Sequence, residues 1–146
     1  MNVHVRNVGG AVVGWVVMAA VVFVLMAGLW MVLGVEGSFR PGSWEVSGAW
    51  SYGSLGLGLA AGVLGGLACA RIAGDGRGTL MLVALVLVLG VANALFQAPV
   101  AEGVRPEGVA MLEAAGSARE PGWVSWLNPV VGVVGILLGA RLGRRE

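Results

Sequence analysis

Four long apolar runs dominate the chain, and short polar segments separate them. The runs cover about residues 9–34, 52–73, 79–98 and 123–142, and the first contains no charged residue. A helix needs roughly 20 apolar residues to cross the hydrocarbon core of a bilayer. The pattern therefore predicts one transmembrane domain, residues 1–146, with the all-α fold of an integral membrane four-helix bundle. We interpret the first run as a retained signal anchor, because it is too long for a signal-peptide core.

Composition supports the membrane assignment. The chain is 58% hydrophobic and 12% charged, whereas a soluble domain carries roughly 25% charged residues. The lipid bilayer is thus the first expected partner, and a net charge of +1 gives no reason to expect nucleic acid as a partner. All nine basic residues are Arg, which we interpret as the codon bias of a GC-rich bacterial genome.

The arginines also predict the orientation. Four spans place both termini and the 71–78 turn on one side of the membrane. Six arginines fall on that side and three on the other, so the positive-inside rule predicts cytoplasmic termini in the inner membrane of a bacterium. The opposite face carries most of the carboxylates. The six arginines on the side of the termini are Arg6, Arg71, Arg77, Arg141, Arg144 and Arg145. The three on the opposite side are Arg40, Arg105 and Arg119.

Two outer loops, residues 35–51 and 99–122, contain most of the remaining features that bear on structure and function. A segment from Pro106 to Ala118 is expected to form a short interfacial helix with an imperfect apolar face. Five of the six tryptophans fall at the outer boundary, where indole rings favour the headgroup level. They form either an outer-leaflet anchor or an interface for a partner, with lipid or pigment contact left open. These are Trp30, Trp44, Trp50, Trp123 and Trp126.

The glycines of the stretch GLGLAAGVLGGLACARIAGDGRG (56–78) have two interpretations. A dinucleotide loop would have to follow a strand and open a helix, but these glycines lie inside an apolar run. Small residues recur every fourth position instead, which in membranes favours close helix packing. The expected packing stripe of the second span faces the first or the fourth span. The predicted packing residues are Ser54, Gly58, Gly62, Gly66 and Ala70, with Gly135, Gly139 and Gly143 in the fourth span.

Polar residues at membrane depth are few. Asn93 and Gln97 lie one turn apart in the third span, and Asn128 precedes Pro129 in the fourth. We expect them to form an interhelical clasp, the alternative being part of a path for a small solute or an ion. One His and one Cys exclude clusters of these ligands. We therefore expect no catalytic, cofactor or metal site and no enzymatic activity.

The order of features loosely resembles a group of uncharacterised small bacterial membrane proteins with four spans. The matching features are the glycine-rich first span before Pro41-Gly42, the sequence LGGLACARIAG, the segment from Asn93 to Pro99, and the terminal LLGARLGRR. The resemblance covers most of the chain. It implies the four-span topology and no known activity.

The expected function follows from closely packed helices, an aromatic outer face and the expected absence of catalytic, cofactor and metal sites. We expect a non-catalytic accessory or structural subunit of a larger membrane complex, with a respiratory or photosynthetic complex as a candidate host and other membrane subunits as partners. The alternative is a small homo-oligomeric channel or passive transporter that uses Asn93, Gln97 and Asn128.

Overall fold

The computed structural model describes residues 2–96 and 103–144. It contains the helices α1 (Val3–Ser38), α2 (Gly48–Ile72), α3 (Gly76–Leu95), α4 (Met111–Ser117) and α5 (Gly122–Gly143). Four of them, α1, α2, α3 and α5, are long and apolar enough to cross a membrane. The prediction of a helical fold with four helices long and apolar enough to span a membrane is thereby confirmed.

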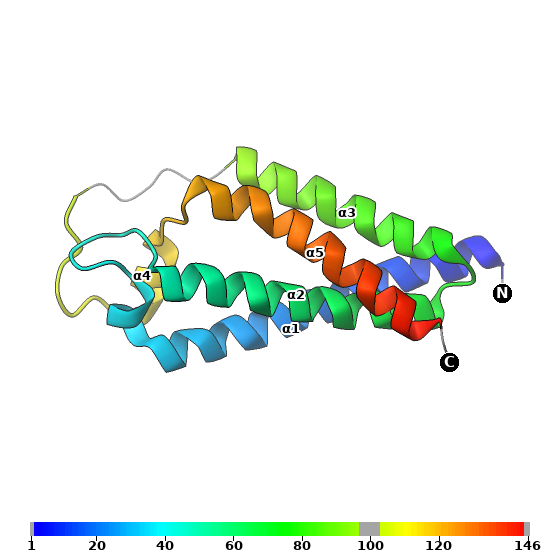
Figure 1. Ribbon diagram of the computed structural model, residues 1–146, viewed down its shortest axis with the longest axis horizontal. Coiled ribbons are helices and arrows are strands. Elements are labelled where there is room, and N and C mark those ends of the chain that lie inside the picture. Colours follow the sequence, from blue (N-terminus) through cyan, green and yellow to red (C-terminus); the bar gives the residue numbers. More distant parts are fainter. Residues whose placement is uncertain (1, 97–102, 145–146) are drawn as a thin grey trace.

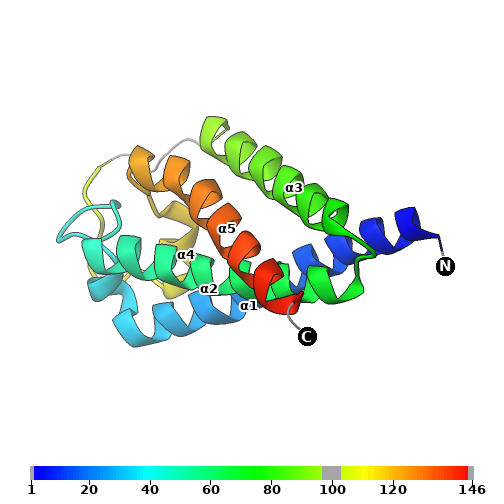
Figure 2. The ribbon, with the colours of Figure 1, turned by 45° about the vertical axis from the view of Figure 1, so that its right-hand side comes forward.

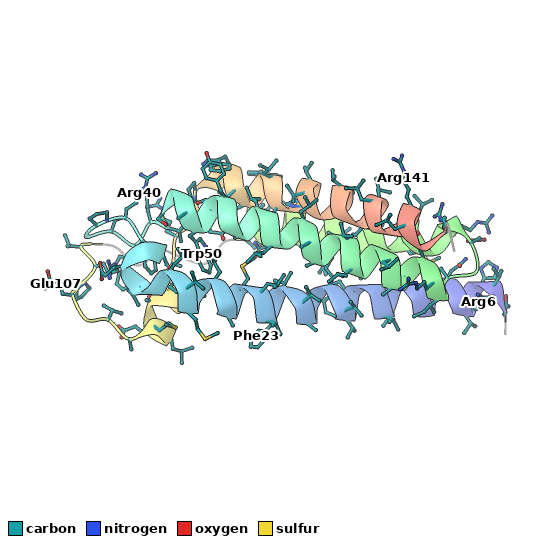
Figure 3. The ribbon with its side chains drawn as sticks, turned by 60° about the horizontal axis from the view of Figure 1, so that its bottom comes forward. Arg6, Phe23, Arg40, Trp50, Glu107 and Arg141 are labelled. Atoms are coloured by element: carbon teal, nitrogen blue, oxygen red, sulfur yellow. The ribbon has the colours of Figure 1, made fainter. Side chains whose placement is uncertain are left out.

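The long helices form a bundle in which α2 packs against both α1 and α5, and α3 packs against α5 and α1 (Figures 1 and 2). Both chain ends lie at one end of the bundle, and α4 lies at the other. Figure 3 shows Arg6 and Arg141 near the termini and Arg40 and Glu107 at the opposite end. The connections between α1 and α2 and between α3 and α5 gather at this second end.

Side-chain caps set the helix starts more closely than hydropathy does. α1 begins at Val3, earlier than expected, because the Asn2 side chain accepts a hydrogen bond from the His4 amide at 3.2 Å. α2 begins at Gly48 because the Ser47 hydroxyl oxygen accepts from the Trp50 amide at 3.2 Å. Asp75 caps α3 through the Arg77 amide at 2.8 Å. The polar residue before each of these three helices thus sets its first turn.

Glycines with positive φ explain where the path of α1 breaks and where α4 begins. At Gly34 the backbone has φ 63° and ψ −177°, so the path of α1 breaks there, at the predicted end of the first span. Gly108 has φ 75°, and α4 starts only at Met111 rather than at Pro106. A residue with positive φ does not fit within a right-handed helix, which explains the shorter α4.

Candidate functional site

The glycines of α2 form two rows that meet two different helices. A Cβ added at Gly62 would lie 2.8 Å from the carbonyl oxygen of Gly132 on α5, and one added at Gly66 would overlap the backbone of Ile136. A Cβ added at Gly65 would lie 2.7 Å from the carbonyl oxygen of Gly14 on α1. The two rows therefore allow α1 and α5 to approach α2 to backbone contact.

The glycines of α5 complete the contact with α2. A Cβ at Gly135 would lie 2.6 Å from the carbonyl oxygen of Leu59, and one at Gly139 would overlap the backbone of Val63. Gly143 lies over Ala70, with 3.1 Å between the added Cβ and that of Ala70. The predicted stripe thus meets the fourth span over three turns of α2.

The outer end of the predicted stripe needs a correction. A Cβ added at Gly58 would meet no atom within 4 Å, so Gly58 lies outside the packing contact. Ser54 is buried, but its hydroxyl donates to the Ser51 carbonyl oxygen within α2 at 3.0 Å. The reason is geometric, because straight helices that cross at an angle stay in contact over a few turns only.

The two connections at the second end fold together into a compact unit, which we call the cap (residues 35–47 and 103–121). Isolated β-bridges join Phe39 to Val46 and Glu45 to Arg119. The Arg119 amide donates to the Trp44 carbonyl oxygen at 2.8 Å. A hydrophobic cluster lies beneath these bridges, with Phe39, Val46, Trp50 and Ala114 at its centre. The cap is therefore a folded layer with its own core.

One arginine ties the two halves of the cap together. The Arg105 guanidinium donates to both carboxylate oxygens of Glu36, each at 2.9 Å, and it lies 5.2 Å above the centre of the Phe39 ring. The Arg105 side chain is 3% exposed, whereas that of Glu36 is 77% exposed. The sequence offered no signal for this pair, because the two residues lie 69 positions apart.

The five boundary tryptophans separate into two groups. Trp30 packs against Trp50 with ring centroids 4.6 Å apart, and Trp44 meets Phe39 edge-on at 6.2 Å. This group belongs to the hydrophobic cluster that joins the cap to the ends of α1 and α2. Trp123 and Trp126 are 48% and 51% exposed, and Trp123 lies 5.8 Å from the ring of Tyr52, which is 70% exposed. Trp123 and Trp126 are thus the more exposed group.

Glu120 is the one carboxyl in the cap with a raised pKa within the described residues. Burial raises the pKa of Glu120, and a hydrogen bond from the Trp50 indole opposes the shift in part. A raised folded-state pKa means that ionisation of Glu120 weakens the folded state. The folded state begins to lose stability as the pH rises through the pKa of an unfolded Glu. The loss of stability is complete above the pKa of Glu120 in the folded state.

Glu120→Gln is therefore expected to stabilise the cap at neutral pH, since the amide oxygen keeps the acceptor for Trp50 without a charge. The gain should disappear in acid, where Glu120 is protonated in both states. Thermal unfolding in detergent, followed by tryptophan fluorescence between pH 4 and 8, measures this. Glu107→Gln removes the same charge from an exposed site and serves as the matched control. A gain that is independent of pH would contradict the assignment.

A polar clasp exists, but at the terminal end of the bundle rather than at Asn93 and Asn128. The Asn7 side chain is fully buried. Its carbonyl oxygen accepts from the amides of Gly74 and Asp75 at 3.0 and 3.2 Å, and its amide donates to the Asp75 carboxylate at 2.8 Å. Asn7 thus fastens the first turns of α1 to the turn between α2 and α3.

Asn7→Leu is expected to lower the free energy of unfolding by about 2–4 kcal/mol, because three hydrogen bonds of the buried Asn7 side chain are lost, each with a net contribution of about 0.5–1.5 kcal/mol. Denaturation by SDS titration in detergent measures the loss. Asn7→Asp keeps the acceptor but faces the Asp75 carboxylate, and Asp75→Asn in the same chain should restore part of the stability. An Asn7→Leu variant with the same free energy of unfolding as the wild type would show that the clasp is dispensable.

The residues predicted for a clasp or path line a pocket instead. Asn93 on α3 and Asn128 on α5 both face a cavity of about 310 Å³ between α1, α3 and α5. Within the described residues, no hydrogen bond joins the two amides. Gln97 lies outside the described residues. Asn93 and Asn128 thus share one cavity without forming the direct clasp.

The described part of the chain contains no group of three or more His, Cys, Asp or Glu side chains that could hold a metal ion. The features that the structure brings together are therefore the glycine contacts, the cap, the exposed aromatic side chains and the pocket of amides. Comparison of the chain with protein-family models, with curated proteins and with solved structures finds no match.

Proposed function

We propose that the protein is a non-catalytic accessory subunit of a larger membrane assembly in the inner membrane of a bacterium, with both termini cytoplasmic. The arginine distribution supports this orientation, because Arg6 and Arg141 lie at the terminal end of the bundle (Figure 3). The cap then faces outward, and α4 lies at the outer membrane interface. A respiratory or photosynthetic complex is a candidate host.

The observation that carries the proposal is a group of three exposed aromatic side chains, Tyr52, Trp123 and Trp126, which we call the aromatic ridge. Large, stiff aromatic side chains dominate the binding energy of protein interfaces. The tryptophans of the cap are already used in its own core, and the glycines of α2 are used against α1 and α5. The ridge is therefore the surface that we assign to a partner.

The charges of the cap support a partner with a basic surface. Two of its arginines are paired internally, Arg105 with Glu36 and Arg40 with Glu45. Glu107 and Glu113 are exposed, so they add negative charge to the surface of the cap. Complementary charge guides the encounter of two proteins and fixes their register.

Site-specific photo-crosslinking in native membranes tests this function. A photoreactive phenylalanine analogue placed at Trp126 should crosslink to one defined membrane protein, and the same analogue at Phe23 should not. Phe23 is 77% exposed and points away from the middle of α1, so it reports contact with lipid. Trp123→Ala should reduce the yield at position 126. A protein that crosslinks to nothing and purifies alone from mild detergent would refute the proposal.

The alternative of a homo-oligomeric channel or passive transporter depends on Asn93 and Asn128. Their cavity is lined by α1, α3 and α5 and is open on one side, whereas backbone contacts fill the space between α2 and α5. A solute path would need a second copy to close the side opening. Solute flux in liposomes that disappears in Asn93→Leu and Asn128→Leu would favour the alternative over an accessory subunit.

A further inference from the structure

The pocket between α1, α3 and α5 holds two amide side chains with no hydrogen-bond partner among the described residues. Asn93 is exposed and Asn128 is half-buried, and both belong to helices of membrane-spanning length. An amide that has neither a protein partner nor water is unfavourable in an apolar setting. A ligand that hydrogen-bonds with these amides would remove the cost.

A second cavity continues the first toward the cap. This groove of about 790 Å³ lies between α1 and α4 and shares Ala19 and Val22 with the pocket of amides. Its walls are apolar and contain Met26, Met31 and Met111. Methionine side chains adapt to an irregular or flexible occupant. The two cavities therefore lie next to each other along α1, one lined by the amides and the other by apolar side chains of α1 and α4.

The lining chemistry narrows the class of ligand. Neither cavity is lined by a charged side chain in the described part of the chain, so the site favours a neutral head over a phosphate or an amine. The amides come from two helices and offer N–H donors to two acceptor atoms. The volume of 310 Å³ is near the lower limit of small-molecule sites, which fits a single ring with Trp15 at its side.

The groove also argues against a partner helix as the occupant. Side chains of α4, among them Leu112 and Ala115, form one wall of the groove next to α1. A helix with side chains is about 10 Å wide and straight, and α4 obstructs the course of such a rod along α1. A flexible hydrocarbon tail can bend beneath α4.

We propose that this site binds a neutral quinone-class lipid, whose two ring carbonyls accept hydrogen bonds from Asn93 and Asn128 and whose hydrocarbon tail lies in the groove between α1 and α4. The proposal concerns binding alone and is independent of the aromatic ridge. It adds a ligand site to a protein proposed as an accessory subunit.

Titration of the protein in lipid nanodiscs with a decyl-tailed benzoquinone tests the site. Trp15 lines the pocket, so its fluorescence should be quenched with saturation at one quinone per chain, and Trp15→Phe should remove most of the quenching. Loss of two hydrogen bonds should weaken binding at least tenfold in the variant Asn93→Leu/Asn128→Leu. Tenfold corresponds to about 1.4 kcal/mol.

Val91→Leu is the matched control, because it introduces the same side chain on α3 outside the lining residues, and it should leave the affinity unchanged. Far-UV circular dichroism verifies that each variant keeps its helices. Quenching without saturation, or equal affinity of the double variant and the wild type, would overturn the proposal. Displacement of the quinone by equimolar dioleoylglycerol would also overturn it, because it would reveal a groove for bulk lipid.

Discussion

Gly66→Ala and Gly139→Ala are expected to destabilise the bundle by about 3 kcal/mol each, at the upper end of the range for overpacked cores. The added Cβ at Gly66 would lie 2.7 Å from the Ile136 Cα, and that at Gly139 would lie 2.8 Å from the Leu67 amide nitrogen. These neighbours are backbone atoms and cannot rotate aside. Accommodation of a single methyl group therefore requires α2 and α5 to separate.

The same helix supplies the control for this prediction. Gly58→Ala and Gly56→Ala add the same methyl group to α2 at positions with no atom within 4 Å. They should leave stability unchanged or raise it by up to about 1 kcal/mol through helix propensity. SDS titration followed by circular dichroism compares the four variants. Equal effects at all four positions would show that glycine acts through propensity and not through the close contact.

Glu36→Ala is expected to destabilise the cap more than Arg105→Met does, although both remove the same ion pair. Loss of Glu36 leaves the buried Arg105 guanidinium without its counter-charge, which is more unfavourable than leaving an exposed carboxylate without a partner. Loss of Arg105 leaves a Glu36 carboxylate that is 77% exposed and that water solvates. The methionine also keeps the contact with Phe39, so we expect a loss of about 1 kcal/mol.

A second ion pair in the cap, with both side chains exposed, is a reference for the loss of stability in these variants. Arg40 and Glu45 are joined at 3.0 Å, nearly the same distance, but both side chains are exposed, at 61% and 41%. Glu45→Ala should therefore cost less than about 1 kcal/mol. Thermal unfolding of the cap, monitored by tryptophan fluorescence, ranks the three variants. Equal losses from Glu36→Ala and Arg105→Met would mean that burial of Arg105 does not govern the pair.

Features that depend on neighbouring residues were predictable from the sequence. The long apolar runs indicate four spanning helices, and the repeat of small residues indicates close packing. Gly34 ends the predicted first span at the position where the backbone of α1 breaks. The extra helical residues before two spans follow from the caps Asn2 and Ser47. Hydropathy detects the apolar run but not the polar cap that precedes it.

The candidate sites were less accessible to prediction because they join distant residues. Asn7 and Asp75 form the polar clasp across 68 positions, and no local pattern distinguishes Asn7 from any polar residue near a terminus. The tryptophans look alike in the sequence, yet Trp50 is buried against the cap and Trp126 is half exposed. Their division depends on how the two connections fold against each other.

The sequence by itself determined that this chain forms four apolar helices with small-residue faces, because hydropathy and spacing are properties of each segment alone. Only the tertiary structure decided which helices those faces meet, that Arg105 is buried beside Glu36, and that Asn93 and Asn128 line one cavity. The physical reason is that burial, pairing and cavity shape are relations between segments. They arise when α1, α3 and α5 pack together and the two long connections close into the cap.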